Sequence, residues 1–382
     1  MIFLMRFCFS LLLVIAISFH TFAQAPAGFF NLDKAPKLGK MASFKASELC
    51  DVADKTQSYL NQFTEDNFAV HAGKVFDESV TLVKVEQTLE FICQTYREDV
   101  RAKRQSRLHD QEFLTTHFDF YRWTPDIATA LKIALKSTNA RKSSMLNAIP
   151  TDKIFLTKYY TKLLIASDVK TAVYNQALYS LPYDETGLTL AEANNDLTIT
   201  RNKFTRQEVI AGVLEEKKLA KALIWLTEEA LHDVLLQGTG VVEVNGQRRY
   251  FNVHRNNGIA YDYAIGKRDQ ARYWYFSEVP SIMGYGETLE SKIAIRPQVS
   301  FAGNVDQLGL GKLFMVSYKQ AGEEISRLGV LSDQGGAFDN NLFQLDLLVD
   351  SYFGWEDYHQ ANKDLPDYAS AWLMLMKPPQ KQ

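Results

Sequence analysis

The sequence has little cysteine and no excess of charge of either sign. Its 382 residues include three cysteines, and 42 Lys and Arg stand against 45 Asp and Glu, for a net charge of −3. So little cysteine excludes a disulfide-rich miniature scaffold, and so balanced a charge excludes a chain built mainly to bind nucleic acid. Hydrophobic residues make up 46% and charged residues 23%, as in a globular protein. This length gives room for two or three domains.

Several common catalytic motifs are also missing. The sequence contains no Gly-x-Gly-x-x-Gly and no phosphate-binding loop of the Walker type, so we expect no nucleotide ligand. No His-x-x-x-His or Cys-x-x-Cys pair occurs, so we expect neither a metal site nor a cofactor. The Gly-x-Ser-x-Gly turn of many serine hydrolases is absent as well.

A long hydrophobic run occurs once, at the N-terminus. Arg6 precedes an apolar run over residues 7–17, and Thr21 and Ala23 are small residues at the places where a signal peptidase requires them. This pattern predicts a signal peptide over residues 1–23, with an uncleaved anchor as the alternative. Cys8 lies at the front of the run, which is the wrong place for the lipidated cysteine of a lipoprotein. We therefore expect export across the inner membrane to the periplasm, with outer-membrane association as an alternative.

The remaining chain changes character near residue 150. Residues 24–150 are predicted to be mostly helical, because apolar residues recur there at helical spacing. Short strand-like segments follow, and Asn245-Gly246 predicts a tight β-hairpin. Cys50 and Cys93 both lie in the helical part, where they are either paired in a disulfide or separately buried thiols.

Four segments of the second half carry a distinctive pattern in a fixed order. They are Phe155-Leu156-Thr157-Lys158-Tyr159-Tyr160, Leu236-Gln237-Gly238-Thr239-Gly240, Asn257-Gly258-Ile259-Ala260-Tyr261, and Asp333-Gln334-Gly335-Gly336-Ala337-Phe338. In this order they resemble blocks of the membrane-bound lytic transglycosylase A (MltA) family, which cleaves peptidoglycan. The chain departs from the family at Asn304, where an aspartate is expected, and at Lys158 and Lys162, which replace a glycine and a proline.

The resemblance implies a mainly β fold with a helical N-terminal part. Residues 151–175 and 280–382 would form a double-psi β-barrel, and residues 176–279 would form an inserted β domain that binds glycan. A groove between the two would hold the sugar strand.

The resemblance also implies the reaction. A single aspartate would protonate the glycosidic oxygen between MurNAc and GlcNAc, and would then take the proton of the MurNAc C6 hydroxyl, which closes a 1,6-anhydro ring. The family's aspartate precedes an aromatic turn, and Asp350, before Tyr352-Phe353-Gly354, fits that place best. Asp350 follows Asp333 by 350 − 333 = 17 residues, against eleven in the family, and Asp346 is therefore the rival candidate.

The residues expected to contact the glycan complete this hypothesis. They are Thr157, Tyr160, Gln237, Gly238, Thr239, Gly240, Tyr261 and Asp333. The expected partners are peptidoglycan glycan strands, and cell-wall proteins are further candidates. The competing hypothesis is a non-catalytic peptidoglycan-binding or scaffold protein of the same fold, because fold alone does not determine function.

Overall fold

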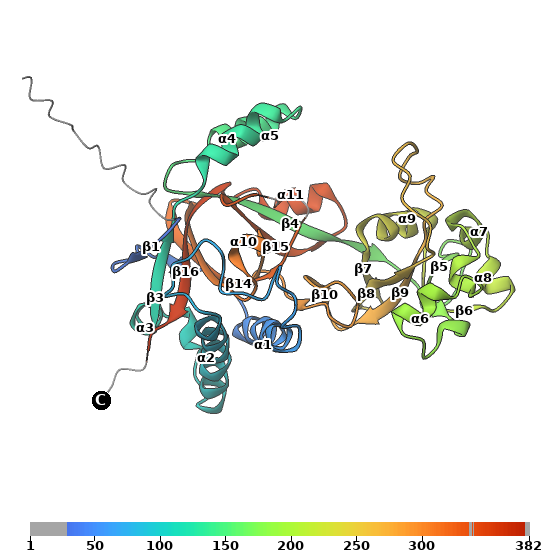
Figure 1. Ribbon diagram of the computed structural model, residues 1–382, viewed down its shortest axis with the longest axis horizontal. Coiled ribbons are helices and arrows are strands. Elements are labelled where there is room, and N and C mark those ends of the chain that lie inside the picture. The colour runs from blue at the N-terminus through green and yellow to red at the C-terminus, as the bar shows by residue number, and fades with distance from the viewer. Residues whose placement is uncertain (1–28, 336–337, 339, 379–382) are drawn as a thin grey trace, which may run out of the picture.

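The chain forms two lobes, a larger one at the left of Figure 1 and a smaller one at the right. The structure is a computed structural model that describes residues 29–335, 338 and 340–378. The signal peptide predicted over residues 1–23 lies outside these residues. Among the described residues, no helix combines the length and the apolar character needed to cross a membrane.

Six strands of the larger lobe close into a barrel. Their order is β16-β13-β14-β12-β15-β4, and β4 pairs with β16 to complete the ring. The β12–β14 and β4–β15 pairs are parallel, and the other four are antiparallel. The predicted mainly β fold with a barrel is thus confirmed. The strands are β4 (Ile154–Ile165), β12 (Ser300–Ala302), β13 (Leu313–Gln320), β14 (Glu323–Asp333), β15 (Gln344–Tyr352) and β16 (Tyr368–Met376).

The long strand β4 connects the two lobes. Its first part pairs with β15 in the barrel, and Leu163–Ile165 pair with Val241–Glu243 of β7 in the smaller lobe. The buried cores divide within this strand, because Leu163 packs in the barrel core and Leu164 packs in the core of the smaller lobe. The core of the smaller lobe thus includes Leu164, which precedes residue 176, the expected start of the inserted domain.

The smaller lobe holds strands and short helices. A hairpin of β7 (Thr239–Val244) and β8 (Gln247–Asn256) turns at Asn245 and Gly246, both with positive φ, as the Asn-Gly dipeptide predicts. The strand β8 also pairs with β9 (Trp274–Val279). The other elements are β5 (Gln176–Pro182), β6 (Ala220–Leu226), α6 (Leu190–Asn195), α7 (Arg206–Ile210), α8 (Val213–Glu216), α9 (Glu228–Gln237) and the 3₁₀ turns Tyr183–Glu185 and Thr200–Asn202.

The N-terminal region is part of the larger lobe. Strand β3 (Phe118–Trp123) pairs with β16, and β2 (Lys40–Met41) pairs with β14, so this region extends the barrel sheet. Buried side chains of α1 (Ala46–Gln62) and α2 (Leu82–Arg101) belong to the barrel core. The remaining elements of this lobe are β1 (Phe30–Asp33), the 3₁₀ turn Arg107–His109, α3 (Gln111–His117), β10 (Ile282–Met283), β11 (Ala294–Ile295), α10 (Val305–Leu308) and α11 (Trp355–Asn362).

Two further helices form an arm on the larger lobe. They are α4 (Ile127–Lys136) and α5 (Ala140–Asn147), which pack against each other at the top of Figure 1. Ala130, Ala134 and Leu146 are buried in a small core that also contains Phe155 of β4. The arm is thereby fixed to the outer side of the barrel.

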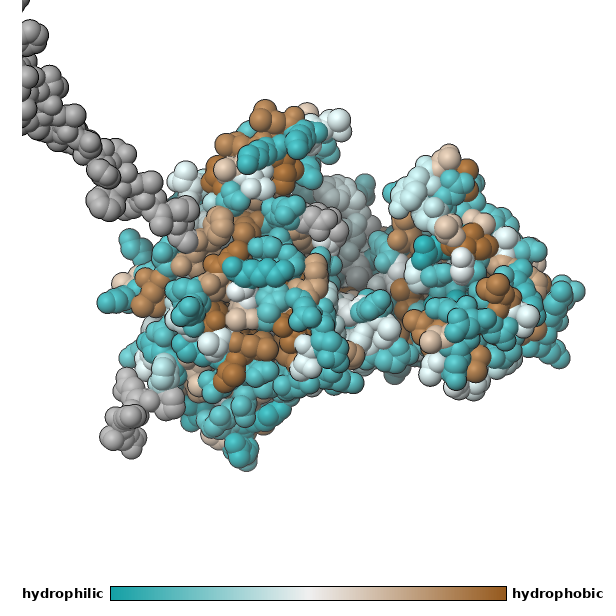
Figure 2. All heavy atoms as spheres, viewed as in Figure 1, coloured by the Kyte–Doolittle hydropathy of each residue, from teal (hydrophilic) through white to brown (hydrophobic). Residues whose placement is uncertain are grey.

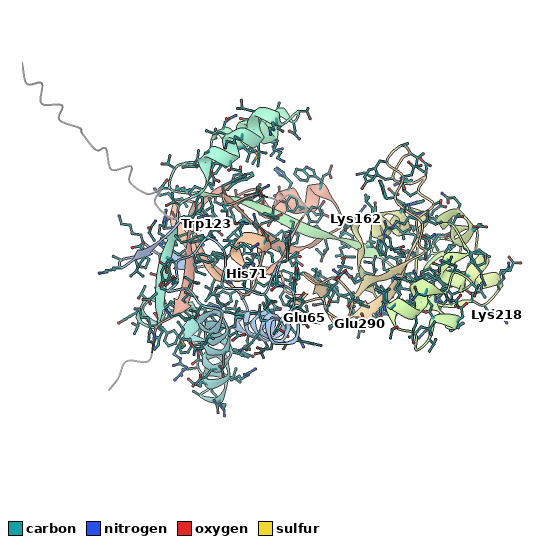
Figure 3. All side chains as sticks on the ribbon, viewed as in Figure 1. Glu65, His71, Trp123, Lys162, Lys218 and Glu290 are labelled. Carbon is teal, nitrogen blue, oxygen red and sulfur yellow. A yellow bond between two sulfur atoms is a disulfide. The ribbon has the colours of Figure 1, made fainter. Side chains whose placement is uncertain are left out.

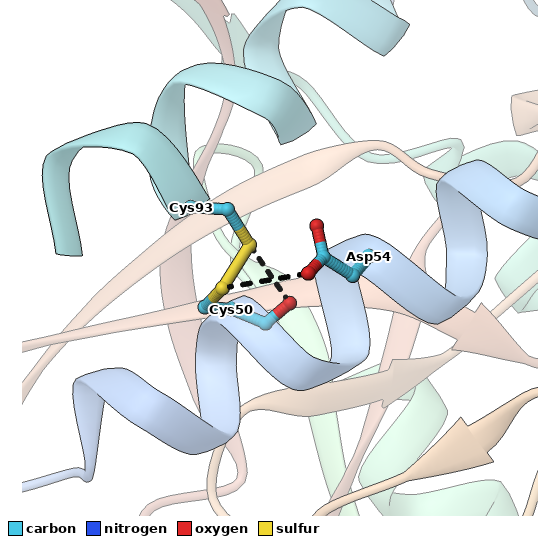
Figure 4. A group of neighbouring side chains, drawn as sticks. All are labelled: Cys50, Asp54 and Cys93. Atoms are coloured by element: carbon cyan, nitrogen blue, oxygen red, sulfur yellow. Dashed lines mark hydrogen bonds between the residues drawn. A yellow bond between two sulfur atoms is a disulfide. The ribbon is translucent and has the colours of Figure 1, made fainter. Parts of the chain in front are cut away.

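A disulfide joins the two long helices. Cys50 of α1 and Cys93 of α2 are bonded, with Cα atoms 4.7 Å apart (Figure 4). The Asp54 carboxylate lies beside them, with Oδ2 3.9 Å from the Cys50 Sγ. Because both sulfurs are used in the bond, they do not offer thiolate ligands to a metal ion. Of the two states left open by the sequence, the structure has the paired one.

We predict that this bond stabilises the larger lobe. The C50S/C93S double variant should lose about 2 to 4 kcal/mol in the free energy of unfolding, because the bond closes a long loop of the unfolded chain. Denaturant unfolding with and without reductant measures this loss. Reductant should destabilise the wild type and leave the double variant unchanged; equal midpoints for all four samples would contradict the prediction.

Candidate active site

The parallel pair β4–β15 places Asp346 beside Thr157. These two residues are direct partners in the register, and on its other side Asp346 faces Ala302 of β12. Leu345 and Leu347 are fully buried in the barrel core. Since side chains alternate along a strand, Asp346 is on the opposite face, where it is half-buried.

Burial changes the acidity of this carboxyl group. The Oδ1 atom of Asp346 is buried and has no hydrogen-bond partner among the described residues. Burial raises the pKa of Asp346 to about 7, and the negative charge of Asp333 adds to the rise, while Thr157 and Lys158 act in the opposite direction. A carboxyl group of this kind keeps its proton in a large fraction of molecules near neutral pH.

A second half-buried carboxyl group lies two strands away. Asp333 ends β14, and Ala302 of β12 pairs with Asp333 on one side and with Asp346 on the other. The Asp333 Oδ2 accepts a hydrogen bond from the Tyr159 hydroxyl at 2.8 Å, and its Oδ1 accepts one from the Gln334 amide at 2.8 Å. Burial raises the pKa of Asp333 to about 6, although both hydrogen bonds and the Lys292 charge favour the carboxylate.

An open cleft of about 600 Å³ lies between the two lobes and reaches Asp333. Its wall on the smaller lobe contains Gln237, Gly238, Thr239 and Asn252, and the opposite wall contains Met283, Tyr285, Lys292 and Asp333. Figure 2 shows the hollow between the lobes, and Figure 3 shows Lys162 of β4 where the strand passes between them. The groove expected between barrel and second domain is therefore present.

Comparison with known proteins supports this architecture. No protein-family model matches the sequence, and no curated protein matches it. Among solved structures, a membrane-bound lytic murein transglycosylase from Agrobacterium tumefaciens has 14% identity and a TM-score of 0.50, and the match covers 87% of this chain and 93% of that one. MltA from Neisseria gonorrhoeae has 13% identity and a TM-score of 0.50, with 87% and 88% covered.

The chain has the MltA fold. The sequence resemblance is thus confirmed for the architecture, which extends over both lobes.

Of the residues predicted in the smaller lobe of this MltA fold, Gln237, Gly238 and Thr239 line the cleft and Gly240 does not. The Gln237 Oε1 accepts a hydrogen bond from the Lys162 amide at 3.2 Å, and the Thr239 Oγ1 accepts one from Asn252 at 3.1 Å. Gly238 has a φ of 74°, which ends α9 and turns the chain into β7. Gly240 is buried, and a Cβ there would lie 3.3 Å from Val234, so its role is packing.

The predicted aromatic residues do not line the cleft. Tyr160 stacks on Tyr358 of α11, with ring centroids 4.5 Å apart. Tyr261 contacts Tyr263 and lines a separate cavity of about 180 Å³ in the smaller lobe with Trp274. Glycan contacts of Tyr160 and Tyr261 remain predictions that this placement does not favour.

The structure separates the two candidate acids. Asp350 has a side chain 44% exposed, and its Oδ1 accepts a hydrogen bond from Arg248 of β8 at 3.0 Å. The Asp350 carboxylate is therefore already paired with a guanidinium near the surface. Asp346 has a buried carboxyl oxygen with no hydrogen-bond partner among the described residues, and it lies beside Thr157, so the geometry favours Asp346. The interval from Asp333 is then 346 − 333 = 13 residues, two more than in the family.

Three residues of the site were missed by sequence reasoning. Tyr159 is adjacent to the chosen Tyr160, but strand alternation directs it to the opposite face, where it reaches Asp333. Asn252 and Lys292 lie in segments with no motif, and only the folded chain brings them to the cleft. Burial lowers the pKa of Lys292, and the negative charge of Asp333 acts in the opposite direction.

We predict a pH-dependent gain in stability when Asp346 is neutralised. The pKa of Asp346 is raised in the folded protein, so folding favours the protonated carboxyl. The contribution of this protonated group to the free energy of unfolding is fully present below about pH 4 and is lost as the pH rises through about 7. At pH 8, D346N should therefore be more stable than the wild type by at least about 1 kcal/mol in the free energy of unfolding, and it should unfold at a higher temperature. At pH 4 the two proteins should differ little. Thermal unfolding at both pH values measures this difference. The matched control is D350N; an equal gain from both variants would contradict the assignment.

Proposed function

We propose that this chain is an exported lytic transglycosylase that cleaves the MurNAc–GlcNAc β-1,4 bond of peptidoglycan and forms 1,6-anhydro-MurNAc. The observation that carries the proposal is the buried Asp346 carboxyl, with a pKa of about 7, next to the cleft residue Asp333. The structures with the same fold bear the names of lytic transglycosylases, which supports the same substrate class.

The proposed reaction needs one group that gives a proton and then takes one. Asp346 donates its proton to the glycosidic oxygen as the bond to C1 of MurNAc breaks. The resulting carboxylate then accepts the proton of the C6 hydroxyl on the same sugar, and that oxygen bonds to C1. Because the attacking hydroxyl belongs to the substrate, its high effective concentration replaces the activation of water by a second carboxylate.

Asp333 has a supporting part in this proposal. Its negative charge raises the pKa of Asp346, and Tyr159 holds its side chain in place by the 2.8 Å hydrogen bond. Gln237, Thr239 and Asn252 offer amide and hydroxyl groups to sugar hydroxyls across the cleft.

The departure at Asn304 is compatible with activity. The Asn304 side chain caps α10 by accepting a hydrogen bond from the Gln307 amide at 3.1 Å, which an amide oxygen does as well as a carboxylate. The departure therefore leaves the Asp346 carboxyl intact. A non-catalytic glycan-binding protein of the same fold is the alternative that the activity measurement decides.

We predict that D346N abolishes turnover and preserves binding. The amide keeps the size of the carboxyl but cannot donate a proton of suitable acidity, so anhydro-muropeptide release should fall by about 10² to 10⁴. D350N should retain nearly full activity. The assay is digestion of purified sacculi followed by mass analysis of the products. Loss confined to D350N would move the acid to that residue, and a wild type that binds sacculi without product would establish the non-catalytic alternative.

The pH profile gives an independent check on the same group. Since the reaction starts from protonated Asp346, kcat/KM should decline as the pH rises through about 7. D333N removes a negative charge that raises the pKa of Asp346, so it should shift this decline to lower pH. An unshifted profile would show that the two carboxyl groups act independently.

We also propose that the protein acts in the periplasm after removal of residues 1–23. The N-terminus of the exported protein should be Gln24, and mass analysis of the periplasmic fraction identifies it. Met1 retained in a membrane fraction would show that the segment is an anchor. Association with the outer membrane is decided by fractionation of the two membranes.

A further inference from the structure

A second cavity lies beside the candidate acid, away from the cleft between the lobes. It has a volume of about 390 Å³ and is formed between the α4–α5 arm, strand β4, α11 and the start of β15. Both Thr157 and Gln344 line it, and the Gln344 Nε2 donates a hydrogen bond to the Thr157 Oγ1 at 2.7 Å. Because Thr157 is the register partner of Asp346, the cavity begins next to the proposed acid.

The cavity combines an apolar wall with a cationic rim. Phe155, Phe343 and Leu146 provide apolar surface, and Tyr358 of α11 adds an aromatic ring. The cavity volume of about 390 Å³ falls within the range of small-ligand sites, about 300 to 1,000 Å³. The wall therefore suits a ligand with short apolar side chains.

The charges of this cavity are mainly positive. Lys158, with its side chain 8% exposed, forms an ion pair with Asp367 at 3.0 Å and also donates to the Pro366 carbonyl. Arg141 and Lys142, on the first turn of α5, are exposed and line the same cavity, and neither has an ion pair in the described part of the chain. Two cations thus remain available for an anionic ligand.

We propose that this cavity binds the peptide stem of the MurNAc residue at the cleaved bond, an inference that rests on the proposed function. The stem is attached to the lactyl group of MurNAc, so it lies close to any acid that acts on the adjacent glycosidic oxygen. It carries alanine methyl groups and free carboxylates, which match the apolar wall and the cations at Arg141 and Lys142. The cleft between the lobes then holds the sugars, and the arm confers a preference for peptide-bearing strands.

The test compares binding of two glycans that differ only in the stem. One is soluble peptidoglycan strands with intact stems, and the other is the same strands after amidase has removed them. The D346N protein is used so that no strand is cleaved during the measurement. It should bind the peptide-bearing strands more tightly, and R141A/K142A in this background should lower that affinity about tenfold while affinity for stripped strands stays constant.

The matched control is K132A in the same background. Lys132 lies on α4 of the same arm, is exposed and does not line the cavity, so its loss removes a charge without affecting the proposed contact. K132A should bind both glycans as the parent does. Equal affinity of the parent for both glycans, or equal losses of R141A/K142A on both, would overturn the proposal. A wild type that fails to release anhydro product argues against the proposed reaction alone, because the binding comparison requires no cleavage.

Discussion

The parallel pairing of β4 with β15 is the interaction on which the rest of the structure depends. It closes the barrel, because β4 also pairs with β16, and it brings together segments separated by almost 190 positions, such as Thr157 and Asp346. The same strand then continues into the second lobe, where it pairs with β7. Strand β4 therefore pairs both with the strand that carries the candidate acid and with a strand of the smaller lobe, and so sets their relative positions.

Burial gives the site its chemistry. A carboxyl group on an exposed strand is an ordinary charged side chain, whereas Asp346 and Asp333 lie on either side of Ala302 with limited access to water. The negative charge of Asp333 adds to the effect of burial in raising the pKa of Asp346, and the hydrogen bond from Tyr159 favours the charge on Asp333. Two carboxyl groups of the same type thus differ in their hydrogen bonding because their surroundings differ.

The difference between Asp346 and Asp350 depends on the fold and not on spacing along the chain. The aromatic turn after Asp350 resembles the family's turn, yet in the structure Phe353 and Trp355 are exposed and Gly354 is the N-cap of α11. A spacing counted along the chain cannot distinguish an insertion before a strand from an extension of the strand itself. Strand pairing places Asp346 opposite Thr157, whereas the Asp350 carboxylate forms an ion pair with Arg248.

The sequence by itself determined the mainly β class and the Asn-Gly hairpin, since these follow from ordered motifs and local backbone preferences. The sequence pattern also predicted Gln237, Thr239 and Asp333 as site residues, and the fold brings them to one cleft. Only the tertiary structure decided that Asp346 has a buried carboxyl oxygen, that Tyr159 rather than Tyr160 donates to Asp333, and that Asn252 and Lys292 line the cleft. The physical reason is that acidity and access depend on neighbours distant in sequence, and these neighbours are set by strand register and burial.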